Sequence, residues 1–246
     1  DLHPRVRRQR QMCIRDSILG ASGCGKSMTA MSIMRLLPKT AQIKSGEIYF
    51  KGENLLLYKE KQMRELRGNR IALIPQDPMT SLNPLYTVGN QLVEAIRAHS
   101  HVSERQALRK AREVMDMVCI PDADRKLKFY PHEFSGGMKQ RIIIAMALAC
   151  QAELIIADEP TTALDVTIQK QIMDLLDDIK KEFGTTILLI SHDLALVSNY
   201  ADNISVMYSG HIVEKAPAKD FFRKPLHPYS IALLDSLPTR NPALKL

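Results

Sequence analysis

A run of small residues around one lysine, GASGCGKS at residues 20–27, has the composition of a phosphate-binding loop. Its glycines let the backbone curl so that successive N–H groups point at phosphate oxygens. Lys26 would reach the β- and γ-phosphates, Ser27 would ligate Mg²⁺, and the helix expected next would present its positive end. The expected nucleotide contacts are Gly20, Ala21, Ser22, Gly23, Cys24, Gly25, Lys26, Ser27 and Met28. The motif predicts a site for a nucleoside triphosphate.

Two adjacent carboxylates, Asp158 and Glu159, follow the apolar run LIIA. Such a run predicts a buried parallel strand, and ligands of parallel sheets bind at the carboxyl ends of the strands. We expect Asp158 to hold the Mg²⁺ shell and Glu159 to polarise an attacking water. Apolar strands commonly end in acidic residues, so this interpretation depends on the phosphate loop elsewhere in the chain.

Three single residues become candidates through their spacing from these two motifs. Gln76 follows the strand-like run RIALIP and could sense Mg²⁺ and the γ-phosphate. His192 follows the run TTILLIS, and Asp165 in TTALDV would by default cap a helix. The expected metal ligands are Ser27, Gln76 and Asp158, and the expected catalytic residues are Glu159 and His192.

A second small-residue stretch, EFSGGMKQR at residues 133–141, looks like half of a phosphate site. It contains a serine and two glycines before an expected helix, but no lysine in the place where a phosphate loop holds one. Its contact residues would be Ser135, Gly136, Gly137 and Met138. One chain therefore carries a complete phosphate loop and, separately, an incomplete one.

The elements that must position these residues alternate as in an α/β protein. Glycines bracket a short strand region near residue 50, and a hairpin is expected to turn on Ser209–Gly210. From about residue 87 to 149 the pattern is helical without strands, and Ser103 and Gln106 form a capping-box pattern there. The sequence thus predicts a P-loop NTPase core, a mostly parallel sheet flanked by helices with a small antiparallel part, plus a helical subdomain insert.

The expected domain order follows from these changes of pattern. It comprises a non-native or disordered leader at 1–17, a first core part at 18–86, the helical subdomain at 87–149, a second core part at 150–215 and a truncated C-terminal extension at 216–246.

The amino-acid composition excludes several classes of protein. The 246 residues are 45% hydrophobic and 25% charged, as in an ordinary globular protein. The longest apolar run spans residues 142–150, too short for the roughly twenty residues that cross a bilayer, and no secretory signal is visible. Four cysteines show no paired metal spacing. The net charge of +7 is spread over mixed-sign helices and the leader, so no nucleic-acid partner is expected.

The order GASGCGKS, PQDP, EFSGGMKQR, LIIADEPTTALD, SHD resembles the ATP-binding subunit of an ABC transporter, from Ile18 to about Pro238. The variants QDPMTSLNPLYTVG and HPYSIALLDSLP resemble its dipeptide, oligopeptide and nickel importer branch. The resemblance implies ATP and Mg²⁺ as cofactors and a peripheral place on the cytoplasmic face of the membrane. It also implies a second ATP-binding subunit, identical or homologous, two permeases and an external solute-binding protein as partners.

The same resemblance gives the incomplete phosphate site a role. In this family the serine-glycine-glycine segment closes on the nucleotide of the opposing subunit, and Asp165 falls in the D-loop. A lysine is then unnecessary in 133–141, because the partner's phosphate loop supplies it. The loop after Gln76 and the helical insert would form the surface that meets a permease.

Both ends depart from the family pattern. Arg15 and Asp16 would fall in a central strand, and burying them unpaired would cost several kcal/mol. Residues 1–17 also lack the aromatic residue that stacks on adenine, which is why we expect them to be non-native or disordered. The C-terminal extension gives no basis for inferring an iron–sulfur site.

Alternatives remain open for the cargo and for the wider class. Dipeptides or oligopeptides are favoured, and nickel or another small solute is the alternative within the branch. A non-transport ABC ATPase acting on nucleic acid would carry coiled coils or zinc modules in the insert, and 87–149 has neither. A plain P-loop kinase would not explain Ser135, Gly136 and Gly137.

Overall fold

The computed structural model describes residues 15–162 and 164–236. A six-stranded sheet lies at its centre, with the strand order β4-β5-β6-β1-β7-β8. The strands are β1 (Arg15–Leu19), β4 (Ile71–Ile74), β5 (Leu154–Asp158), β6 (Thr186–Ser191), β7 (Asn203–Tyr208) and β8 (His211–Pro217). Five strands are parallel, and β8 runs antiparallel to β7. A separate antiparallel pair joins β2 (Tyr49–Phe50) and β3 (Glu53–Asn54). The predicted mixed sheet is confirmed.

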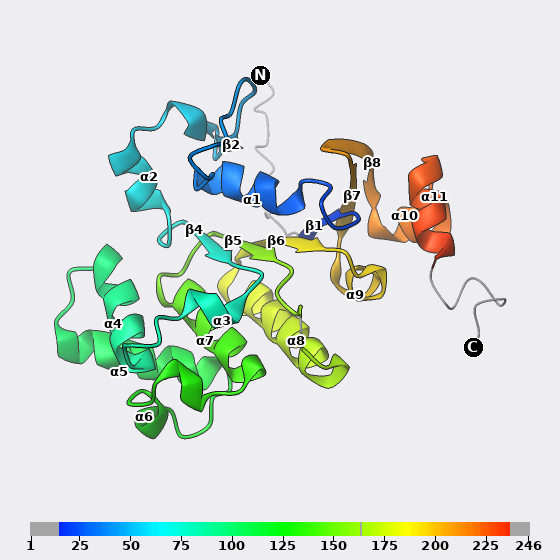
Figure 1. The fold of residues 1–246 in the computed structure, drawn as a ribbon. Coiled ribbons are helices and arrows are strands. Elements are labelled where there is room, and N and C mark those ends of the chain that lie inside the picture. The colour runs from blue at the N-terminus through cyan, green and yellow to red at the C-terminus, as the bar shows by residue number, and fades with distance from the viewer. Residues whose placement is uncertain (1–14, 163, 237–246) are drawn as a thin grey trace, which may run out of the picture.

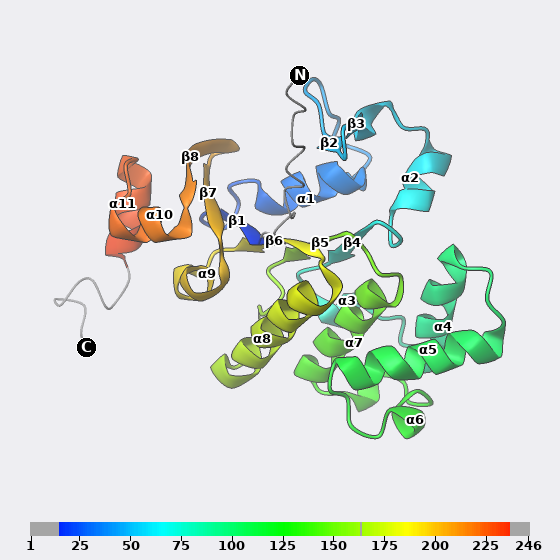
Figure 2. The same cartoon turned by 180° about the vertical axis from the view of Figure 1, so that it is seen from behind.

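Helices cover both faces of the sheet (Figures 1 and 2). One face carries α1 (Lys26–Met34), and the other carries α7 (Gly136–Ala149) and α8 (Val166–Phe183). Successive residues of a strand point to opposite faces, so Ile155 packs in the core on the α7 and α8 side and Ile156 in the core on the α1 side. This two-sided burial explains why the strands read as continuous apolar runs.

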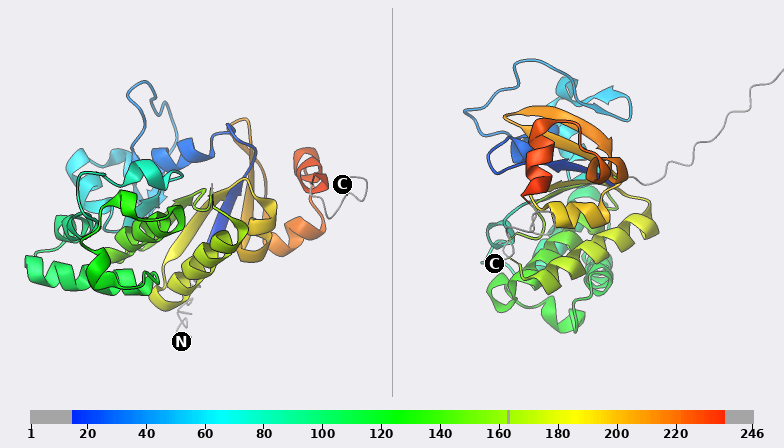
Figure 3. Two further views of the ribbon diagram at one scale, coloured as in Figure 1. Left: turned by 60° about the horizontal axis from the view of Figure 1, so that its bottom comes forward. Right: turned by 90° about the vertical axis from the view of Figure 1, so that its right-hand side faces the viewer.

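The helical insert joins the core on the α7 and α8 side and lies at the opposite end of the molecule from the C-terminal helices (Figure 3). The predicted capping box of Ser103 and Gln106 starts α5 and is confirmed. The remaining helices are α2 (Glu60–Leu66), α3 (Pro78–Ser81), α4 (Val88–His99), α5 (Glu104–Met117), α6 (Ala123–Lys126), α9 (Leu194–Tyr200), α10 (Ala218–Arg223) and α11 (Pro228–Asp235), with short 3-10 turns at Leu55–Leu57 and Pro131–Glu133.

The start of the chain corrects one prediction. Residues 15–17 are not leader: they form the first part of β1, between β6 and β7. Arg15 is fully buried, and its guanidinium donates to Asp177 Oδ1 at 2.8 Å and to the Tyr200 carbonyl at 3.1 Å. Asp16 accepts from Asn203 Nδ2 at 2.9 Å. The two charges are tolerated in a central strand because both have partners. The expected cost of burial applied to unpaired charges. Residues 1–14 of the expected leader lie outside the described residues.

Electrostatics around Arg15 support this account. Burial lowers the pKa of the Arg15 guanidinium, and the charges of Asp177 and Asp202 oppose that effect. The guanidinium also lies 5.3 Å from the centre of the Tyr200 ring. Burial and a hydrogen bond to Asp174 raise the pKa of Tyr200 to about 12. Arg15, the first residue of β1, therefore lies within a network of opposite charges.

Removing the main partner of Arg15 should destabilise the fold. In Asp177→Ala the buried guanidinium loses its closest carboxylate, and we expect unfolding free energy to fall by about 2–3 kcal/mol. This is below the range for fully buried pairs, because the Asp177 side chain is 29% exposed. Chemical denaturation followed by circular dichroism measures it. The neighbouring, exposed Asp178→Ala is the control. Equal stability of the two variants would refute the role of the pair.

Candidate active site

The loop of residues 20–27 links β1 to α1, and its shape depends on glycine. Gly23 and Gly25 have φ angles of 80° and 109°, which a side chain would strain. A Cβ on Gly20 would lie 2.3 Å from the carbonyl oxygen of Met207, so no larger residue fits there. The Gly210 N–H donates to the Cys24 carbonyl at 2.9 Å. The turn between β7 and β8 thus supports the loop from one side.

Lys26 lies inside this loop and is 4% exposed. Its Nζ donates to the carbonyls of Gly20 at 2.8 Å and Ala21 at 3.0 Å, and it lies 3.7 Å from Glu159 Oε1. A buried ammonium needs such acceptors. The loop therefore holds one positive charge at the point where its N–H groups and the start of α1 would receive an anion.

Glu159 is the centre of the predicted catalytic group. Its carboxylate accepts hydrogen bonds from Gln76 Nε2 at 2.9 Å and from Thr162 Oγ1 at 3.1 Å, and it lies 3.1 Å from His192 Nδ1. Gln76, Glu159 and His192 follow the neighbouring strands β4, β5 and β6, so parallel pairing brings the three predicted residues together. Glu159 has a left-handed φ of 48°, a strained conformation common at functional sites.

The adjacent carboxylates differ in their titration. Burial of the Glu159 carboxyl would raise its pKa and is the largest single effect, but hydrogen bonds from His192 and Thr162 and the charge of Lys26 outweigh it and lower the pKa. Burial raises the pKa of Asp158, against a hydrogen bond from Ser27 and the charge of Lys26. Glu159 is therefore ionised at neutral pH and can orient a water molecule through a hydrogen bond.

The residues at the end of β5 fit a magnesium ion. Asp158 is 3% exposed, and its Oδ1 is buried with no hydrogen-bond partner among the described residues, while the Ser27 hydroxyl bonds to the carboxyl group. Carboxylate and hydroxyl oxygens are ligands that Mg²⁺ accepts, with phosphates and water completing the shell. Clusters of three or more His, Cys, Asp or Glu that could hold a metal do not occur in residues 15–162 and 164–236. The amide of Gln76 bonds to Glu159, and its role as a metal ligand stays a prediction.

The incomplete phosphate site forms the exposed start of α7. The Ser135 hydroxyl caps the helix by accepting from the Met138 N–H at 3.4 Å. Gly136 and Gly137 form the first turn, where a Cβ on Gly137 would lie 2.7 Å from Ile168 of α8. α7 and the phosphate loop's helix α1 lie on opposite faces of the sheet (Figure 1). Asp165 caps α8 by accepting from the Ile168 N–H, as its default interpretation predicted.

Two contacts at this site were not predicted from the sequence. Thr162 bonds to Glu159, and its place three residues later in a turn was the available signal. The Tyr229 hydroxyl accepts from the Ala21 N–H at 3.1 Å, although the two residues are 208 positions apart. No local pattern could have joined them.

Comparison with known proteins identifies the family of this chain. A family model described as ABC transporter matches residues 15–162, more than half of the chain. The chain belongs to the ABC transporter family of ATPases. A second model, described as the oligopeptide/dipeptide transporter C-terminal region, matches residues 213–246. The resemblance stated from the motifs is confirmed.

Relatives and solved structures agree with this assignment. A probable peptide ABC transporter ATP-binding protein of Sinorhizobium fredii is 58% identical over 91% of this chain and 67% of its own length. A dipeptide transport ATP-binding protein of Bacillus subtilis is 50% identical over 90% of this chain and 67% of its own. The dimeric post-hydrolysis structure of the ATP-binding cassette MJ0796 with ADP and Pi has a TM-score of 0.74 at 26% identity, covering 85% of this chain and 87% of that one. The chain spans about two thirds of the length of its curated relatives.

Within the described residues, every helix is too short or too polar to span a membrane.

Proposed function

We propose that this ABC ATPase hydrolyses ATP to power the import of dipeptides or oligopeptides. The observation that carries the proposal is the arrangement at Glu159, an ionised carboxylate beside the phosphate-loop lysine and within hydrogen-bond reach of Gln76 and His192. An ionised carboxylate next to a phosphate loop suits activation of water against a γ-phosphate. The peptide-transport names of the relatives support the cargo.

In this proposal the residues of the site have different roles. Lys26 exchanges the carbonyls of Gly20 and Ala21 for phosphate oxygens and neutralises their charge. Ser27 and Asp158 would hold Mg²⁺, which would neutralise negative charge on the phosphates. Glu159 orients the attacking water and takes up its proton, and His192 stays within hydrogen-bond distance of that carboxylate.

We assign Ser135, Gly136, Gly137 and Met138 to the nucleotide of a second subunit, either a copy of this chain or a homologue. Support comes from the exposed position of Ser135 and from the N-terminus of α7, where N–H groups favour an anion. The dimeric state of the related cassette MJ0796 agrees with it. Asp165 belongs to the same proposed interface at the cytoplasmic face of the membrane.

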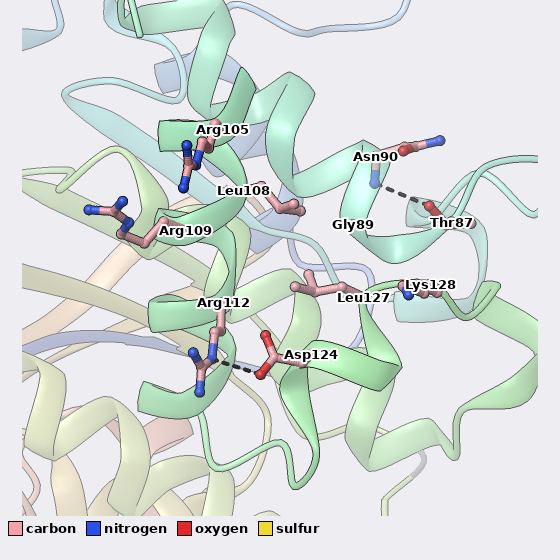
Figure 4. A pocket seen from close by; sticks show the side chains of 10 residues that line it. All are labelled: Thr87, Gly89, Asn90, Arg105, Leu108, Arg109, Arg112, Asp124, Leu127 and Lys128. Carbon is pink, nitrogen blue, oxygen red and sulfur yellow. Dashed lines mark hydrogen bonds and ion pairs between the residues drawn. The ribbon is translucent and has the colours of Figure 1, made fainter. Parts of the chain in front are cut away.

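A groove in the helical insert is the proposed contact with the permeases (Figure 4). Its volume is about 730 Å³, and it is lined by the start of α4, by one face of α5, by Asp124 of α6 and by residues 127–128 after α6. The groove is lined by one carboxylate, Asp124, which lies 3.2 Å from Arg112. Three further basic residues, Arg105, Arg109 and Lys128, also line it. Leu108 is 47% exposed among them. An apolar patch inside a basic rim suits a permease segment with acidic side chains.

The groove is tested by charge reversal. Arg105→Glu with Arg109→Glu should reduce co-purification with the permeases at least tenfold, since like charges repel the proposed acidic segment. The matched control is Lys44→Glu with Lys61→Glu, which reverses two exposed charges outside the groove. ATP binding by the isolated chain should be unchanged in both. Undiminished assembly of the groove variant would contradict the proposed contact.

Hydrolysis is tested by Glu159→Gln. Removing the carboxylate should lower ATP turnover by roughly 10²–10⁴, because general-base contributions have that size. Binding of Mg-ATP should persist, since Lys26, Ser27 and Asp158 remain. Phosphate release and calorimetry measure the two quantities, and the exposed Glu182→Gln is the control.

Parental turnover in Glu159→Gln would remove the catalytic assignment. The peptide cargo is tested separately by uptake of labelled dipeptides and of nickel into cells that carry the whole transporter. Uptake of nickel alone would replace the peptide proposal.

A further inference from the structure

The entrance of the phosphate loop is held from two sides. The carbonyls of Gly20 and Ala21 accept from Lys26 Nζ. The N–H of Ala21 donates to the hydroxyl of Tyr229, which belongs to α11 near the end of the described chain. Lys26 must change its partners when a phosphate arrives, whereas the Tyr229 contact can persist. Tyr229 therefore holds the Gly20–Ala21 segment through a contact that does not involve Lys26.

Tyr229 is linked to β8 through Glu214 and His227. The two carboxylate oxygens of Glu214 accept from the backbone N–H groups of Leu226 at 2.9 Å and His227 at 3.0 Å. His227 Nδ1 then accepts from the Tyr229 N–H at 3.1 Å and caps α11. The Tyr229 ring also packs on Tyr208, with the ring centres 4.6 Å apart. A continuous set of contacts thus runs from β8 to the phosphate loop.

These contacts lie on the side of the site away from the reacting groups. In the sheet order, β7 and β8 follow β1 on one side, while β6, β5 and β4, which position His192, Glu159 and Gln76, lie on the other. Tyr229 and the catalytic group therefore contact opposite sides of the loop. A change at Tyr229 should alter how well the loop receives phosphates without altering the water-activating groups.

We infer that Tyr229 is a positioning residue that pre-shapes the phosphate loop and couples nucleotide binding to the C-terminal segment 213–235. The inference rests on the proposed function only in taking this loop as the nucleotide site. A loop held in its binding shape loses less conformational freedom on binding, which strengthens affinity. Coupling is reciprocal, so bound nucleotide should in turn tighten α11 on the loop.

The first test compares Tyr229→Phe with the parent chain. Phenylalanine keeps the packing on Tyr208 and removes the acceptor for the Ala21 N–H. We expect the dissociation constant of ADP and the KM for ATP to rise roughly 3- to 10-fold, as for one lost hydrogen bond, with kcat unchanged. Tyr208→Phe is the matched control, because the hydroxyl of Tyr208 makes no hydrogen bond within the described residues. Thermal unfolding should be the same for both variants.

The second test is hydrogen exchange of α11. ADP should slow exchange at Tyr229 to Asp235 in the parent chain and should do so less in Tyr229→Phe. A merely structural tyrosine would not make this exchange depend on nucleotide. Unchanged ADP affinity in Tyr229→Phe, or exchange in α11 that ignores ADP, would overturn the inference. Both readouts use ADP binding, so loss of the proposed ATP hydrolysis alone would leave them decisive.

Discussion

The buried ammonium of Lys26 is the constraint on which the site depends. At 4% exposure it needs close acceptors, and the bent backbone of Gly20 and Ala21 and the carboxylate of Glu159 provide them. The loop also approaches Met207 so closely that only glycine fits at position 20. Glu159, which follows β5, places a carboxylate beside the loop. The charge that would bind phosphate is the same charge that organises the loop around it.

The pKa values of two neighbouring carboxyl groups shift in opposite directions because their surroundings differ. Asp158 is buried, one of its oxygens has no hydrogen-bond partner in the described part of the chain, and burial raises its pKa. Glu159 is surrounded by donors, which outweigh burial and lower its pKa. The first suits a cation, and the second suits a hydrogen bond to water. Adjacent positions thus serve separate proposed roles, since successive residues at a strand end point in different directions.

Sequence patterns were sufficient wherever the controlling interaction is local. The periods of the strands, the capping box at Ser103 and the glycine loop at 20–27 are all short-range, and the structure confirms each. The joining of Gln76, Glu159 and His192 also followed, because parallel strands bring their carboxyl ends together.

The patterns failed where distant residues decide. Arg15 looked wrong for a central strand because its partner Asp177 lies 162 positions away. Tyr229 could not be linked to Ala21 for the same reason. A charge or hydroxyl carries no local sign of its partner, so only the fold reveals whether burying it is tolerable.

The central claim is that each nucleotide site is complete only when a second subunit adds its Ser135 segment. Complementation tests it most directly. A Lys26→Ala chain keeps the segment at α7 but loses its own phosphate loop, and a Ser135→Arg chain keeps the loop but loses the segment. Each variant alone should be inactive, and equimolar mixing should restore ATP hydrolysis through one complete composite site. A mixture as inactive as its separate components would contradict a composite site formed by two copies of this chain.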